Sequence, residues 1–284
     1  MTVLVPTSLD EALSALAADE HALVLAGGTD AMVEVNAGHR KPSLVVAVNR
    51  VAELRSWTFD PAARAVRIGA AVTYSELMQA PIADLVPALA QAARTVGSPQ
   101  IRNAGTLGGN LGTCSPAGDG LPVLSALDAT VHLASASGER LLTVHDFMVG
   151  VKRTARRPGE LITAITLPVL SGFQGYSKVG VRNAMVIALA TACVAVDTPT
   201  ASVRVALGSV GTTILRCPEA ESMAMSEVDF GSRSASAEVV RHFGELAAAH
   251  SRPIDDHRAT AAYRRHAIGV LASRLLRRAF PNEQ

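Results

Sequence analysis

The order of apolar and polar residues near the N-terminus predicts a small α/β unit. Ser8 and Glu11 have the spacing of a helix-capping box, and apolar residues then recur every three or four positions, which predicts a helix from residue 9. Two uninterrupted apolar runs follow, at residues 22–26 and 44–48, and short runs of this kind predict buried strands. We therefore expect one subdomain over residues 1–57.

Residues 58–170 continue with mixed helices and strands. Thr73 and Glu76 repeat the capping-box spacing, and Pro87 lies where a further helix is expected to begin. Three apolar runs predict strands, the first two as a hairpin around the turn sequence ASGE: residues 130–135, 140–144 and 160–167. These elements predict a second subdomain.

The pattern changes after residue 170, from alternating helices and strands to strands followed by helices. Three successive strands are predicted at residues 176–181, 188–196 and 202–210. Two helices with apolar stripes are predicted at residues 234–250 and 260–280. The polar residues 222–237 are expected to form a mobile connection. The change places a domain boundary near residue 170, between a first domain over residues 1–170 and a second over residues 171–284.

The bulk composition supports two well-buried domains and excludes some partners. The chain has 284 residues, longer than the usual single core, with 49% hydrophobic and 18% charged residues. Its net charge of +1, from 26 basic and 25 acidic side chains, gives no electrostatic reason to expect nucleic acid or an anionic membrane as partner. The longest apolar stretch, residues 184–196, is shorter than the roughly 20 residues of a membrane span. The first six residues lack the basic segment and apolar core of a secretion signal, so we expect a cytoplasmic protein.

The cysteine and histidine patterns predict no metal site on this chain. Cys114, Cys193 and Cys217 show no C-x-x-C spacing, and the eight histidines show no H-E-x-x-H grouping. An iron–sulfur cluster normally takes four cysteine ligands, one more than the chain contains.

Two glycine-rich segments are the strongest candidates for ligand binding. They are LAGGTD at residues 25–30, hereafter the first loop, and GTLGGN at residues 105–110, the second loop. The first loop follows a predicted strand, and the carboxyl ends of strands are where α/β units bind ligands. Glycine permits positive φ and close approach of the backbone, so the amides of both loops are expected to face one pyrophosphate. Neither loop has the G-x-G-x-x-G or G-x-x-x-x-G-K-[ST] spacing, and each one alone is also compatible with a simple tight turn.

The sequence around the second loop resembles one family. The run TVGSPQIRNAGTLGGNL at residues 95–111, continued by SPAGD at 115–119, closely resembles the FAD-binding medium subunit of the molybdenum hydroxylases, which include xanthine dehydrogenase and carbon monoxide dehydrogenase. Residues 26–30 resemble the first flavin loop of that family, and IDDHR at 254–258 with AYRR at 262–265 resembles its C-terminal motif. The resemblance implies an α+β fold. An FAD-binding domain of two α/β subdomains of the PCMH type would be followed by a C-terminal domain of a three-stranded antiparallel sheet plus helices.

The resemblance also implies a function. The chain would be an oxidoreductase subunit that binds FAD and passes electrons from two [2Fe-2S] clusters in a small iron–sulfur subunit to an external acceptor. A large subunit would hold the molybdenum cofactor, and the assembly would be a dimer of heterotrimers. No side chain of this chain would act on the substrate, so no catalytic residue is predicted. Two alternatives stay open: a stand-alone flavin oxidoreductase of the same broad fold, and an assembly subunit that binds no flavin.

The resemblance implies FAD contacts at twelve positions: Ala26, Gly27, Gly28, Thr29, Asp30, Thr106, Gly108, Gly109, Asn110, Asp119, Ile162 and Lys178. Asp119 is expected near the adenosine ribose, because a carboxylate accepts two hydrogen bonds from vicinal hydroxyls, and Lys178 is expected near the flavin. Other interpretations remain for three of them, namely a helix N-cap for Asp30, a loop cap for Asp119 and an exposed strand lysine for Lys178. Residues 151–153 and 211–216 depart from the usual family pattern, which leaves the partner interface and the acceptor open.

Overall fold

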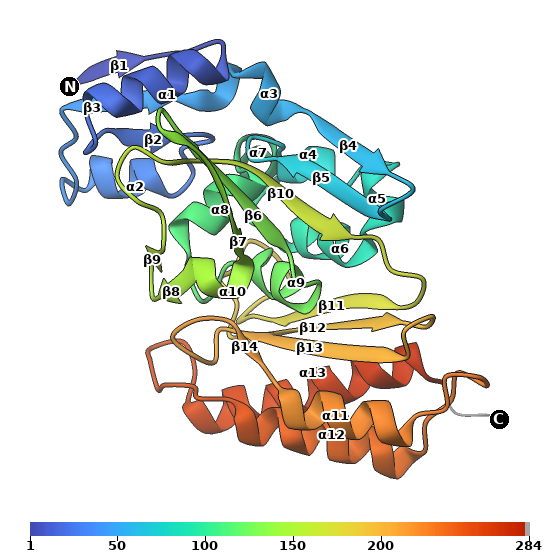
Figure 1. The fold of residues 1–284 in the computed structure, drawn as a ribbon. Coiled ribbons are helices and arrows are strands. Elements are labelled where there is room, and N and C mark those ends of the chain that lie inside the picture. The colour runs from blue at the N-terminus through green and yellow to red at the C-terminus, as the bar shows by residue number, and fades with distance from the viewer. Residues whose placement is uncertain (282–284) are drawn as a thin grey trace.

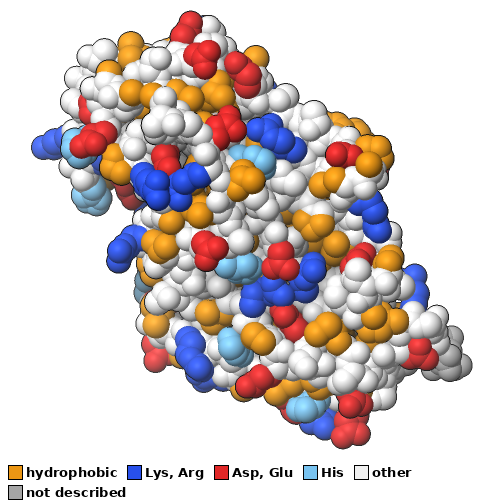
Figure 2. Space-filling model, viewed as in Figure 1, with side chains coloured by type: hydrophobic (Ala, Val, Ile, Leu, Met, Phe, Trp, Pro, Cys, Tyr) orange, Lys and Arg blue, Asp and Glu red, His pale blue; other side chains and the backbone are white. Residues whose placement is uncertain are grey.

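The computed structural model describes residues 1–281, and Figure 1 shows them as three units stacked along the long axis of the molecule. The N-terminal unit lies at one end, a unit built on a five-stranded sheet lies in the middle, and a sheet covered by helices lies at the other end. No helix within residues 1–281 is both long and apolar enough to cross a bilayer. Acidic and basic side chains are mixed over the face seen in Figure 2.

The N-terminal unit is a parallel sheet of strand order β1-β3-β2 with helices beside it. Ser8 caps the first helix by accepting a hydrogen bond from the Glu11 amide at 3.2 Å, and Ala12 and Leu16 of that helix are buried against Val46. This confirms the predicted helix and both predicted strands. The elements are β1 (Thr2–Leu4), α1 (Leu9–Ala18), β2 (Leu23–Leu25), α2 (Ala31–Asn36), β3 (Leu44–Ala47), the 3₁₀ helix η1 (Val48–Arg50) and α3 (Ala52–Arg55).

The middle unit is an antiparallel sheet of order β4-β5-β10-β6-β7 with short helices. The predicted capping box of Thr73 and Glu76 is present, and Pro87 begins α6 as expected. The predicted hairpin is β6 and β7, and the strand predicted at 160–167 is β10. The elements are β4 (Trp57–Asp60), β5 (Ala65–Gly69), α4 (Tyr74–Leu77), α5 (Ile82–Leu85), α6 (Pro87–Thr95), α7 (Pro99–Ala104), α8 (Leu107–Thr113), α9 (Leu121–Ala126), β6 (Thr130–Ser135), β7 (Gly138–Thr143), α10 (Val144–Phe147), β8 (Met148–Gly150), β9 (Arg153–Thr154) and β10 (Leu161–Pro168).

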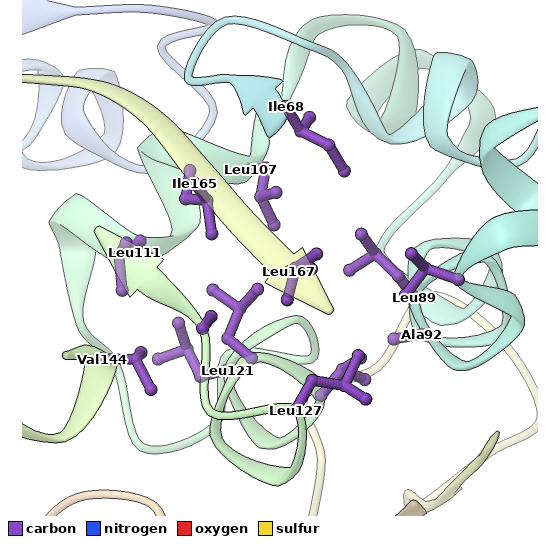
Figure 3. Close-up of a cluster of buried hydrophobic side chains, with 14 of the residues drawn as sticks. Ile68, Leu89, Ala92, Leu107, Leu111, Leu121, Leu127, Val144, Ile165 and Leu167 are labelled. Carbon is purple, nitrogen blue, oxygen red and sulfur yellow. The ribbon is translucent and has the colours of Figure 1, made fainter. Parts of the chain in front are cut away.

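The core of the middle unit fixes the position of the second loop. Figure 3 shows Leu107 and Leu111, one turn apart on α8, pointing into the same apolar cluster as Ile165 and Leu167 of β10. Both leucines are fully buried, so α8 has one face anchored in the core. The loop that begins this helix is therefore held against the sheet.

The C-terminal unit is an antiparallel sheet with one face on helices and the other on the middle unit (Figure 1). Successive residues of a strand point to opposite faces, so Tyr176 and Cys193 join the core of the middle unit, whereas Val194 and Val205 pack against the helices. The elements are β11 (Gln174–Val179), β12 (Ala190–Asp197), β13 (Ser202–Gly208), β14 (Leu215–Arg216), α11 (Pro218–Glu227), α12 (Ala237–His250) and α13 (Ala261–Ala279).

The mixed α/β fold agrees with the expected class, with two differences in the C-terminal unit. The two-residue strand β14 pairs with β13, so the sheet has four strands where three were expected. Residues 222–227, expected in a connection, complete the unpredicted helix α11. The boundary near residue 170 stays a prediction.

Candidate cofactor site

One cavity of about 790 Å³ lies where the N-terminal and middle units meet, a size typical of small-molecule sites. Both glycine-rich loops line it, and so do residues 185–187 of the C-terminal unit. Eleven of the twelve predicted contact residues lie on its wall, and the exception is Lys178. Segments that are about eighty residues apart in the sequence thus share one cavity.

The first loop presents unpaired backbone amides to this cavity. It turns directly after β2, and Gly28 adopts a φ of +71°, a left-handed conformation that suits glycine. The N–H groups of residues 27–30 donate to no acceptor within residues 1–281. Asp30 occupies the N-cap position of α2 without capping it; its carboxylate instead accepts a hydrogen bond from the Thr113 hydroxyl at 3.2 Å. Residues 27–30 thus bring four consecutive unpaired amides to the cavity wall, and runs of unpaired amides are a common means of binding phosphate oxygens.

The two loops touch through their backbones. A Cβ placed on Gly27 would overlap the carbonyl oxygen of Ala104, the residue that precedes the second loop. Only a glycine at this position allows the loops to approach so closely. The absence of a side chain at Gly27 therefore sets the distance between the two loops and the width of the cavity at this point.

The second loop is paired differently from what the sequence analysis expects. The Gly108 amide donates to the Ala70 carbonyl at 2.9 Å, and the Gly109 and Asn110 amides donate to the hydroxyl and carbonyl oxygens of Thr106 at 2.9 and 3.0 Å. These three amides are engaged because α8 begins here, with Thr106 as its N-cap. These amides are thus already paired within the protein, and their contact with a cofactor stays a prediction. The second loop supplies instead a close-packed wall opposite the first.

Ile162 lies on the cavity wall, next to a β-bulge. The pairing of β10 with β6 shifts register between Ile162 and Ala164, and both Leu161 and Ile162 line the cavity. Ile162 is 6% exposed and gives this wall an apolar surface.

Asp119 lies on the cavity wall as one member of a buried polar cluster. Its Oδ1 accepts a hydrogen bond from the Tyr176 hydroxyl at 2.8 Å, and its Oδ2 lies 2.7 Å from Nζ of Lys178. The Lys178 and Asp119 side chains are 7% and 8% exposed. Lys178 is therefore not the exposed strand lysine of the alternative interpretation. Burial raises the pKa of the Asp119 carboxyl, and the Lys178 ammonium ion opposes this rise.

Charged residues that the sequence analysis did not select also line the cavity. Lys152, in the turn between β8 and β9, forms an ion pair with Glu34 of α2 at 2.8 Å and so connects the middle and N-terminal units. The hydrogen bond from Lys152 lowers the pKa of Glu34. Arg40 and Arg156 lie on the same wall. The unusual basic run at 151–153 was the one sequence signal for this group.

Other groups with redox or metal-binding potential lie away from solvent or from one another. Cys114, Cys193 and Cys217 are all buried free thiols, and burial raises the pKa of each. Within residues 1–281, no three His, Cys, Asp or Glu side chains are grouped so that they could hold a metal ion.

Two family profiles match the chain. The profile described as the FAD binding domain in molybdopterin dehydrogenase matches residues 1–170. The profile described as the CO dehydrogenase flavoprotein C-terminal domain matches residues 176–279.

Similar proteins span almost the same length. The glyceraldehyde dehydrogenase medium chain of Sulfolobus acidocaldarius is 32% identical over 268 residues, which is 93% of this chain and 92% of the relative. The nicotinate dehydrogenase FAD-subunit of Eubacterium barkeri is 34% identical over 77% of each chain. The carbon monoxide dehydrogenase structure from Hydrogenophaga pseudoflava that lacks the Mo-pyranopterin moiety superposes with a TM-score of 0.89 at 27% identity, covering 98% of this chain and 96% of that one.

Proposed function

This chain belongs to the family of FAD-binding medium subunits of the molybdenum hydroxylases, and on that premise we propose that it is the flavoprotein subunit of such an oxidoreductase. It binds one FAD noncovalently and passes electrons from [2Fe-2S] clusters of a small subunit to an external acceptor. A large subunit holds the molybdenum cofactor and oxidises the substrate. FAD supplies a redox centre that accepts electrons singly and releases them as a pair.

The observation that carries the proposal is the donor set of the first loop. The unpaired amides belong to residues 27–30, which line a cavity of about 790 Å³, and a diphosphate provides the oxygens that such amides bind. The first loop packs through Gly27 against Ala104, and the second loop packs through Gly108 against Ala70, so both loops are held in place beside the cavity. The residues present therefore fit a dinucleotide.

Roles for the predicted contact residues follow from this placement. The residues of the first loop bind the diphosphate through their backbone: Ala26, Gly27, Gly28, Thr29 and Asp30. Thr106, Gly108, Gly109 and Asn110 form the facing wall, with the Thr106 hydroxyl as a polar contact. Asp119 accepts hydrogen bonds from ligand hydroxyls, and Ile162 packs against an apolar part of the cofactor.

The substrate is set by a partner, because no group of this chain is assigned to act on it. The relatives support this, since they are subunits of dehydrogenases named for substrates as different as glyceraldehyde and nicotinate. We place the complex, a dimer of heterotrimers, in the cytoplasm. The three buried free thiols suit a reducing compartment.

The test is to purify the native complex through a tag on this chain and to measure its flavin, iron and molybdenum content. The proposal expects all three, with FAD released unmodified by heat or acid. Flavin without either metal, in a complex shown to be intact, would reject the three-subunit assignment. Turnover by the chain alone would support a stand-alone flavoenzyme, and a colourless chain that takes up no FAD would support an assembly subunit.

A further inference from the structure

The cluster around Asp119 lies partly outside the cavity, and its two donors come from another unit of the fold. Asp119 is a middle-unit residue just before α9, whereas Tyr176 and Lys178 lie on β11 of the C-terminal unit. Of the three, Asp119 alone lies on the cavity wall. The two β11 side chains reach the cavity only through this carboxylate.

We propose that Lys178 is a positioning residue, whose ammonium ion holds Asp119 as an oriented carboxylate on the wall of the FAD cavity and does not itself contact the cofactor. This inference rests on the proposed function, because it assigns a role within the same site. It places part of the FAD affinity in the C-terminal unit.

The hydrogen-bond geometry supports this division of roles. Lys178 Nζ also donates to the Thr95 carbonyl at 3.2 Å, at the last residue of α6, where a helix favours a cation. The ammonium ion is thus engaged by two protein acceptors, Asp119 on the cavity wall and the Thr95 carbonyl, which does not line the cavity. A carboxylate has about four lone-pair positions, and Tyr176 and Lys178 use two of them. Acceptor capacity remains for a hydroxyl of the ligand.

The cluster gives a buried carboxylate a partner of opposite charge. An isolated carboxylate at this depth would take up a proton, and a protonated Asp119 would lose much of its strength as an acceptor. The nearby groups that face it are Tyr74 of α4, Tyr176 and Lys178, with Cys193 of β12 beyond Tyr176. Burial raises the pKa of both tyrosines and of Cys193, so these three stay neutral in the neutral pH range. Lys178 is therefore the cation that balances Asp119.

The experiment measures FAD binding to the full chain after the bound flavin has been removed. Fluorescence titrations between pH 5.5 and 8.5 compare the unmodified chain with Lys178→Met, Asp119→Asn and the double variant. Lys178→Met is expected to weaken FAD binding about tenfold near neutral pH, in line with the loss of a hydrogen bond to a charged group. The pH below which affinity falls should move up by about one unit, because an opposite charge lowers a carboxyl pKa by that much or more. The double variant should match Asp119→Asn alone.

Two controls separate positioning from loss of the fold. Lys41→Met removes the charge of an exposed lysine outside the cavity and should leave FAD binding unchanged. Tyr176→Phe removes one donor to Asp119 without unbalancing its charge, and should weaken FAD binding about threefold. The double variant removes both charges, so its thermal unfolding without FAD should lie closer to that of the unmodified chain than Lys178→Met does.

The outcomes distinguish the inference from the proposed function. Additive losses in the double variant, or a Lys178→Met variant with unchanged affinity and pH dependence, would overturn the positioning role while leaving FAD binding intact. Failure of the unmodified chain to bind FAD would overturn the proposed function and the inference together.

Discussion

Replacing Gly28 with alanine tests whether the first loop binds the cofactor through its backbone. Gly28 has a φ of +71°, and an L-residue in the left-handed region costs about 1–2 kcal/mol. The added Cβ would lie 3.2 Å from Cγ of Met32 and 3.4 Å from Cδ1 of Leu25, both atoms of side chains that can shift slightly. Strain rather than collision therefore dominates, and the backbone relieves it by rotating the amides of the loop.

Gly38 provides a matched control for that strain. Its φ is +74°, almost the same as that of Gly28, and no atom lies within 4 Å of the Cβ position. Gly38 is not on the cavity wall. Both alanine variants should lose about 1–2 kcal/mol of unfolding free energy without FAD. Only Gly28→Ala should also lose FAD affinity, by about tenfold or more, because one misdirected hydrogen bond to a charged phosphate costs about 1.5–3 kcal/mol.

The assay is urea unfolding of both variants with and without saturating FAD. Ligand that binds only the folded chain raises its stability by RT ln(1 + [FAD]/Kd), so a tenfold weaker Kd removes about 1.4 kcal/mol of the gain. Gly38→Ala should keep the full gain. Equal gains in the two variants would refute the backbone role of the first loop.

Three further changes test other parts of the site and its support. Gly27→Ala forces a Cβ into the Ala104 carbonyl, so it should abolish measurable FAD uptake and lower stability by about 3 kcal/mol, as followed by flavin absorbance and urea unfolding. Lys152→Met removes an ion pair between two residues that line the cavity, and stopped-flow fluorescence should show FAD release that is a few-fold faster and no longer slowed by low salt. Glu160→Gln breaks the buried pair with Arg140 and should cost about 2 kcal/mol at pH 7. The Arg140 hydrogen bond lowers the pKa of Glu160, so the stability that the pair contributes is complete above the unfolded-state pKa and is lost as the pH falls through the lower folded-state pKa. The stability difference between the variant and the unmodified chain should therefore shrink as the pH falls through that range.

Most of the fold is predictable from local sequence because its strongest elements bury one continuous apolar face. The strands β2 and β3 are short runs of aliphatic residues, and α12 and α13 have apolar stripes. The helix α11 escapes prediction because it buries only the small side chains Ala220 and Ala224. The strand β14 has two residues and forms because it pairs with β13. No local sequence pattern predicts this pairing.

The site is predictable in part, for a related reason. The glycine content of the sequence identifies both loops, because positive φ and close approach of two backbones both favour glycine. Whether an amide is free depends on remote partners: the Gly108 amide is occupied by the Ala70 carbonyl, about forty residues earlier in the chain. Lys152 lies in an exposed turn, and only its ion pair with Glu34 fixes the position of its side chain at the cavity. Such pairings are properties of the folded chain.

The unequal pairing of the two loops explains why both are rich in glycine for different reasons. In the first loop, glycine at position 28 permits a backbone path that leaves four amides without internal acceptors. In the second loop, a Cβ on Gly108 would overlap Ala70, so glycine there allows α8 to pack against the end of β5. In the proposed complex a ligand phosphate satisfies the amides of the first loop, whereas those of Gly108, Gly109 and Asn110 in the second loop are satisfied by the fold itself. It follows that removing FAD should loosen residues 27–30 while leaving α8 protected, a contrast that amide hydrogen exchange would measure directly.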